Sequence, residues 1–131
     1  MMPMHACLRV VLPALAVAGL LVACGRPDEV PAQLPYFEPG VQFSVEPAAG
    51  ATCNNGAYRG VASWEVPPSL TSKVEIQVGD QRQVFARSND ASGSEETGEW
   101  TSSGMLFVLL DRETDMVLGA LRSGAGPCGA G

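Results

Sequence analysis

Apolar and polar residues alternate with a period of two after residue 40, and this alternation constrains the fold more than any other feature of the chain. Successive side chains of a β-strand point to opposite faces, so the pattern indicates strands with one buried face. It is clearest in two sets of apolar residues: Val41, Phe43 and Val45, and Val74, Ile76 and Val78. Residues 58–66 repeat it and end at Pro67-Pro68, so the sequence predicts at least three half-buried strands.

Further strands are expected in the second half of the chain. Residues 83–86 predict a short strand, and residues 117–121 a returning final strand. Residues 105–110 are apolar on both faces, which is typical of a central strand. Residues 88–98 are polar and predict a loop, followed by a short strand around Trp100.

The fold class follows from this series. About seven short strands, separated by turn residues and without an amphipathic helix, predict an all-β, antiparallel β-sandwich. The domain is expected to span residues 41–131.

Prolines recur every four residues in the segment before the first strand, residues 24–40. They are Pro27, Pro31, Pro35 and Pro39. This spacing excludes a helix and favours extended, partly stiff backbone. We therefore expect a linker that reaches about 40–50 Å at most. Tyr36 and Phe37 are its aromatic residues, and packing onto the domain edge is their simplest role.

The first 23 residues have the three parts of a secretory signal peptide. A short basic region ends at Arg9, an apolar core occupies residues 10–23, and small residues close it. The core is shorter than the roughly 20 residues that a membrane-spanning helix needs. The sequence therefore predicts a leader that is removed, with an uncleaved anchor as the alternative.

The end of the leader, Leu21-Val22-Ala23-Cys24, resembles the lipobox of bacterial lipoproteins. The resemblance implies that Cys24 carries a diacylglyceryl group, that the leader is cut before it, and that the new amino terminus is acylated. Each buried acyl methylene contributes about 0.8 kcal/mol, so three chains would hold the protein on a membrane. In such lipoproteins an Asp directly after the Cys favours retention in the inner membrane. Here that residue is Gly25, so the resemblance implies the outer membrane, with its periplasmic side favoured over the cell exterior. A secretory signal without lipidation is the alternative.

The processed chain would be small and acidic. Residues 24–131 are enough for one small domain. Loss of Arg9 leaves seven of the eight basic residues against all fourteen acidic ones, a net charge of −7. This balance argues against a nucleic-acid partner and against anionic lipid bound through a basic patch.

Two cysteines remain for the domain, because Cys7 leaves with the leader and Cys24 would be modified. Two thiols in an exported chain most simply form one disulfide, here between Cys53 and Cys128. The chain-entropy model gives roughly 4–5 kcal/mol for a loop of this length. A metal site is the alternative, but zinc wants about four ligands and the only histidine, His5, lies in the leader. The covalent lipid is therefore the one non-protein group expected.

Ser63-Trp64-Glu65-Val66-Pro67-Pro68, with residues 74–78, resembles the second and third strands of fibronectin type III and related immunoglobulin-like domains. The resemblance implies that Trp64 packs in the core. Thr97-Gly98-Glu99-Trp100 and Gly104-Met105-Leu106-Phe107 resemble a bacterial immunoglobulin-like module, often appended to surface, secreted or glycan-related proteins. The resemblance covers about residues 41–128 and implies a sandwich without identifying a ligand.

One departure from that family pattern concerns a tyrosine. These domains often place a tyrosine in the penultimate strand, where its hydroxyl bonds to backbone and forms a tyrosine corner. Here Phe107 is the nearest aromatic residue, so that bond cannot form at this position.

The sequence has serine residues that could act as nucleophiles but lacks the residues that would activate them. Ser102 and Ser103 have no histidine to act as a base once the leader is gone. Lys73, the only lysine, is predicted on a solvent-facing strand position. We therefore expect structural serines and no serine hydrolase.

Carboxylates occur in two groups. Glu95 and Glu96 are adjacent, whereas Asp111, Glu113 and Asp115 are two residues apart. Glycoside hydrolysis needs two carboxyl groups across a cleft, and a calcium loop needs a glycine and a distal bidentate glutamate that are missing here. A solvated hairpin tip explains the second group, so we expect neither an enzyme nor a metal site.

Exposed aromatic residues are the remaining candidates for binding. Trp100 follows a polar stretch, and together with Tyr36 and Phe37 it forms the predicted binding surface, with core or edge packing as the alternative. Residues 88–100 and 111–115 are further candidate surfaces. The sequence thus favours a non-catalytic envelope module for interaction, spacing or assembly with an envelope protein or glycan. A carbohydrate-binding module is the alternative.

Overall fold

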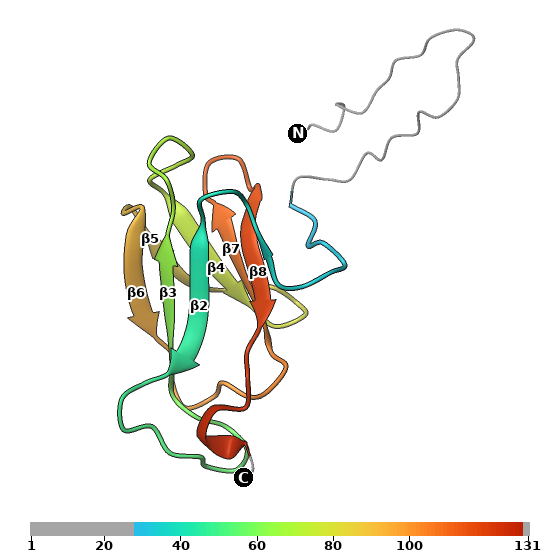
Figure 1. The fold of residues 1–131 in the computed structure, drawn as a ribbon, viewed down its shortest axis with the longest axis vertical. Helices are drawn as coiled ribbons and strands as arrows, with labels where there is room; N and C mark the ends of the chain where they lie inside the picture. Colours follow the sequence, from blue (N-terminus) through green and yellow to red (C-terminus); the bar gives the residue numbers. More distant parts are fainter. Residues whose placement is uncertain (1–27, 130–131) are drawn as a thin grey trace, which may run out of the picture.

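The computed structural model of the protein describes residues 28–129 (Figure 1). The predicted signal peptide, residues 1–23, and the predicted lipidation site, Cys24, lie outside the described residues. The described elements are β1 (Tyr36–Phe37), β2 (Gln42–Pro47), β3 (Gly60–Glu65), β4 (Val74–Val78), β5 (Gln83–Ser88), β6 (Ser92–Glu96), β7 (Leu106–Asp111), β8 (Val117–Arg122) and the 3-10 turn η2 (Gly126–Cys128).

The strands form two sheets that pack face to face (Figure 1). One sheet has five strands in the order β1-β8-β7-β4-β5, and the other has three in the order β2-β3-β6. Every pairing within them is antiparallel. The predicted all-β antiparallel sandwich is confirmed, and its arrangement is consistent with an immunoglobulin-like fold.

The main core lies between the two sheets and uses the alternation seen in the sequence. Its buried residues are Val41, Phe43, Val45, Ala62, Trp64, Val66, Val74, Ile76, Phe107, Leu109 and Leu118. Trp64 is buried, and its indole N–H donates to the Asp90 carbonyl at 3.1 Å. A β-carbon on Gly93 would lie 2.8 Å from Cζ2 of that ring, so only glycine lets β6 approach the tryptophan this closely.

A second apolar cluster covers the outer face of the five-stranded sheet. Its buried residues are Leu106, Val108, Leu110, Val117 and Ala120, and Val30, Leu34 and Tyr36 pack against them. We call residues 28–37 the N-terminal strap. The described part of the segment expected to be a linker therefore belongs to the folded body, which begins well before residue 41.

Two local predictions were wrong. Residues 88–98 were expected to be a loop but contain strand β6, which pairs with β3. All five residues of β6 are exposed, so the strand is held by its backbone ladder and leaves no apolar pattern in the sequence. Trp100 lies in a turn and not in a strand, and only its neighbour Thr101 makes an isolated bridge, with Tyr58.

The contact between Gly93 and Trp64 predicts the effect of one methyl group. Gly93→Ala should lower the free energy of unfolding by about 1–3 kcal/mol, because the ring or the β6 backbone must shift. Thermal unfolding followed by circular dichroism measures this as a lower Tm. Gly124→Ala is the matched control, since a β-carbon there meets nothing within 4 Å. Equal melting temperatures for the two variants would contradict the packing.

Candidate functional site

A groove of about 790 Å³ runs along one open side of the sandwich, between β2 and β8. Its wall is largely apolar and includes Leu34, Phe37, Phe43, Val45 and Leu121. Glu46 and Arg122 supply its charged side chains. A smaller hollow of about 450 Å³ adjoins it and shares Phe37, Phe43 and Ser44. Together the two hollows follow the length of β2.

The groove exists because two neighbouring strand edges lack full partners. Within residues 28–129, β2 pairs only with β3, so its other edge is open. Strand β1 covers β8 at only two positions, with Tyr36 opposite Ala120 and Phe37 opposite Gly119. The rest of that edge of β8, towards Arg122, lines the groove.

The backbone groups of β8 that face the groove can be assigned from the ladder. Ser123 donates its N–H to the Met105 carbonyl and accepts from the Gly104 N–H, so its backbone faces β7. Backbone direction alternates along an antiparallel strand. The N–H and C=O of Arg122 therefore point away from β7, beyond the end of β1.

The same alternation applies to β2. The backbone of Gly60 bonds to Thr97 on the β6 side, through both its N–H and its C=O. Pro47 lies opposite Gly60 in the register, so the backbone of Pro47 points away from β3. Because the direction alternates, the N–H and C=O groups of Phe43 and Val45 also point away from β3, towards the open edge. Open strand edges of this kind are templates for another strand. The groove thus combines an apolar floor with unpaired backbone donors and acceptors.

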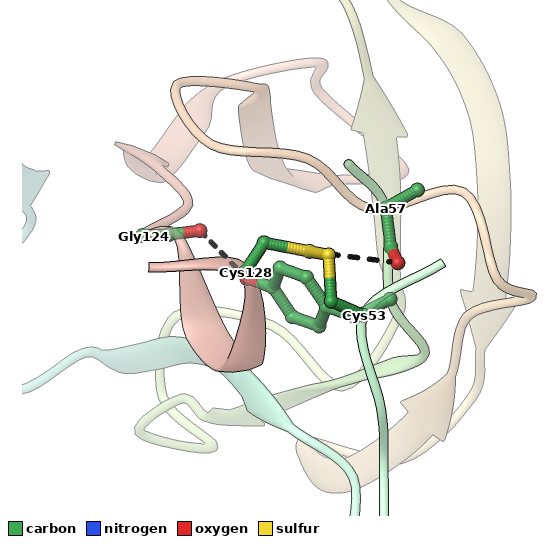
Figure 2. The surroundings of a disulfide bond; sticks show 5 residues. Cys53, Ala57, Gly124 and Cys128 are labelled. Atoms are coloured by element: carbon green, nitrogen blue, oxygen red, sulfur yellow. Dashed lines mark hydrogen bonds between the residues drawn. A yellow bond between two sulfur atoms is a disulfide. The ribbon is translucent and has the colours of Figure 1, made fainter. Parts of the chain in front are cut away.

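Tyr58 closes one end of the groove and fixes the C-terminal segment. Its side chain is 1% exposed, and its hydroxyl donates to the Gly124 carbonyl at 2.7 Å (Figure 2). A β-carbon on Gly126 would lie 2.7 Å from the ring, so that glycine packs flat against it. This sandwich therefore has a hydrogen bond from a tyrosine hydroxyl to the backbone, but the tyrosine lies just before β3 and not in the penultimate strand. The alternation over residues 58–66 predicts that Tyr58 lies on one face of a strand, and it gives no sign of this hydrogen bond.

The predicted disulfide between Cys53 and Cys128 is formed (Figure 2). It joins the β2–β3 loop to η2, across a sequence separation of 75 residues. Cys128 Sγ also lies 3.7 Å from the Ala57 carbonyl oxygen. The covalent bridge and the tyrosine bond hold the same end of the chain.

Two tyrosines have raised pKa values. Burial raises the pKa of the Tyr58 hydroxyl, and the nearby negative charge of Glu46 raises it further. The pKa of Tyr36 is raised first by its hydrogen bond to the Glu38 carboxylate, then by burial and by the charge of Glu38. Both hydroxyls therefore stay protonated at neutral pH and act as hydrogen-bond donors.

The three aromatic residues of the predicted binding surface do not come together. Tyr36 and Phe37 form β1 at one edge of the five-stranded sheet. Trp100 contacts Phe85 of β5, which is the opposite edge. Phe37 takes part in the groove, whereas Trp100 does not line it.

Trp100 packs as the outermost ring of an aromatic group. It meets Phe85 edge to face at a centroid distance of 5.4 Å and stacks on the buried Phe107 at 6.3 Å. A bulge in β5 supports this contact, because Ile76 pairs with Ala86 and Gln77 with Val84, which leaves Phe85 as the extra residue. Trp100 remains 38% exposed, but both of its aromatic partners are at least partly buried.

Asp111 and Glu113, two of the carboxylates singled out in the sequence, serve local structure. Asp111 is buried, and its Oδ1 accepts the Glu113 N–H at 2.9 Å, which stabilises the turn after β7. Glu113 pairs with Lys73 at 3.5 Å. Between residues 28 and 129, no three or more His, Cys, Asp or Glu side chains gather closely enough to hold a metal ion. No helix in that same part of the chain is long and apolar enough to cross a membrane.

No protein-family model matches the sequence, and neither a curated protein nor a solved structure matches it. Any function must therefore be inferred from the geometry of the groove and from the sequence of the N-terminal region.

Tyr58 predicts a pH-dependent contribution to stability. Tyr58→Phe removes one hydrogen bond and should lower the free energy of unfolding by about 1 kcal/mol at pH 7. Because the folded-state pKa is raised, the wild-type advantage is complete below the ordinary tyrosine pKa of about 10 and falls as the pH rises above it. Urea unfolding of both proteins at pH 7 and pH 11 tests this. An advantage that is zero at pH 7, or that grows at pH 11, would contradict the assignment.

Proposed function

We propose that this chain is a lipid-anchored protein of the bacterial cell envelope whose sandwich domain binds an envelope partner without catalysis. The lipobox-like Leu21-Val22-Ala23-Cys24 supports the anchor and, with Gly25, an outer-membrane location. The disulfide supports export, because structural disulfides persist in oxidising compartments such as the periplasm.

The groove between β2 and β8 is the observation that carries the binding proposal. Its apolar wall can accept alternate side chains of an extended segment, and the outward backbone groups of Phe43, Val45 and Arg122 can pair with that segment. The partner chemistry is therefore an extended, partly apolar stretch of polypeptide. The polar side chains of Ser44 and Glu46, and Pro47 at the end of β2, limit indiscriminate pairing at this edge.

The other open edges support this choice by contrast. Strand β6 carries two adjacent glutamates, Glu95 and Glu96, and no apolar side chain. Strand β5 is interrupted by its bulge at Phe85. Trp100 is the feature behind the alternative carbohydrate-binding function, but its immediate partners Phe85 and Phe107 do not form an exposed stacking platform with it.

A substitution at the anchor tests the location. Cys24→Ala should move the protein from the membrane fraction to the soluble fraction, because the acyl chains have no other proposed attachment. Fractionation of cell envelopes with metabolic palmitate labelling measures both properties. Cys24→Ala protein that keeps its label would exclude this anchor.

A photo-crosslinking residue in the groove tests the binding surface. We place it at Ser44, on the groove wall, and at the control Ser94, which lies in the same cross-strand row at the far edge of the same sheet. Crosslinking in intact envelopes should give a discrete adduct from position 44 and at least five-fold less from position 94. The same adduct in equal yield from both positions would contradict binding in the groove.

A further inference from the structure

The N-terminal strap fixes the chain to the domain from the first described residue onward. The carbonyl of Asp28 accepts a hydrogen bond from Arg82 Nη1 at 2.7 Å, and Arg82 lies in the turn between β4 and β5. Val30 and Leu34 then pack on the outer face of the five-stranded sheet, and Tyr36 begins β1. The ten residues of the strap therefore add no length between the domain and whatever precedes Asp28.

We infer that the sandwich sits directly on the bilayer surface, with the β4–β5 end towards the lipid headgroups. This inference rests on the lipid anchor proposed above. Only residues 25–27 separate Cys24 from Asp28. An extended chain spans at most about 3.3–3.6 Å per residue, so the two Cα atoms are at most about 14 Å apart.

The thickness of the headgroup layer and the maximum distance between Cys24 and Asp28 together limit how far Asp28 can lie from the membrane surface. An acylated Cys24 must lie near the boundary of the hydrocarbon core, and the headgroup layer adds about 5–8 Å on each side of the membrane. Asp28 then lies within about 10 Å of the outer limit of the headgroups. A domain tethered by residues 24–40 would instead range over several times that distance.

The surface brought to the lipid is the β4–β5 turn, residues 79–82, with the neighbouring Arg122. Arg82 bonds to Asp28 and to Gln77 Oε1, both through uncharged oxygens. Arg122 donates to the Gly104 carbonyl and lies 3.8 Å from the exposed carboxylate of Asp80. Two guanidinium groups therefore occur at this end beside two acidic residues, Asp28 and Asp80, so these four residues add no net negative charge facing the lipid phosphates.

The turn at the opposite end of the sandwich is expected to lie far from the lipid and serves for comparison. Strands β4 and β7 are antiparallel, with Val78 opposite Phe107 and Val74 opposite Asp111. The turn after Asp111 therefore lies at the far end from the β4–β5 turn. Five- to six-residue strands separate the two ends by about 17–20 Å at least.

Fluorescence quenching by headgroup-labelled lipid tests the orientation. Full-length protein carrying Gln81→Cys or Glu113→Cys, both exposed turn positions, is labelled with bimane and reconstituted in phosphatidylethanolamine–phosphatidylglycerol vesicles that contain a headgroup nitroxide. We expect at least three-fold stronger quenching at position 81 than at position 113. A matched protein with twenty Gly and Ser residues inserted between Pro27 and Asp28 should lose most of this difference.

Two failures are distinguishable in the same samples. Protein that does not float with the vesicles would overturn the lipid anchor, and the inferred seating with it. Protein that floats but shows equal quenching at positions 81 and 113, with or without the insertion, would overturn the seating alone.

Discussion

Burial of β7 on both faces is the constraint on which the rest of the structure depends. All six residues, Leu106–Asp111, are buried. Phe107 and Leu109 face the three-stranded sheet, whereas Leu106, Val108 and Leu110 face outward and would be exposed in a bare two-sheet sandwich. Leaving each large apolar side chain in water costs about 1.5–3 kcal/mol. The N-terminal strap removes that cost by covering the outer face, so residues before the first long strand are part of the fold.

Apolar patterns in the sequence predicted most of the strands, whereas the strand without any apolar side chain was missed. Alternation identified β2, β3 and β4, and the continuous apolar run marked β7 as central. Strand β6 was missed because its stability comes from backbone pairing with β3, which imposes no side-chain pattern. The strap was interpreted as a linker because its apolar residues stand among prolines, and the apolar cluster that they cover lies about 70 residues or more further along the chain. Of the groove, only Phe37 was predicted, since two strand edges that meet in space have no local signature.

The C-terminal segment shows how the fold uses long-range contacts where the sheets end. Cys128 is joined to Cys53, and Tyr58 bonds to Gly124 while its ring contacts Gly126. The bridge acts mainly by restricting the unfolded chain, whereas the tyrosine contributes only to the folded state. Glycine against an aromatic ring recurs at Gly93 with Trp64 and at Gly98 with Trp100. These contacts let loops and edge strands pack closely without a large additional core.

The strap and the groove have a common cause. A longer β1 would continue along β8 and pair with the outward backbone of Arg122, which would fill the groove. Instead the chain leaves that edge before Tyr36, because Leu34 and Val30 are needed over Val108 and its neighbours on the outer face. The same ten residues cannot cover the face and also complete the edge. Covering the face shortens the reach of the chain towards Cys24, and leaving the edge incomplete keeps the groove between β2 and β8 open. In the proposed lipid-anchored protein, the groove has Arg122 at its wall, near the end that faces the bilayer, so a partner would bind close to the membrane surface.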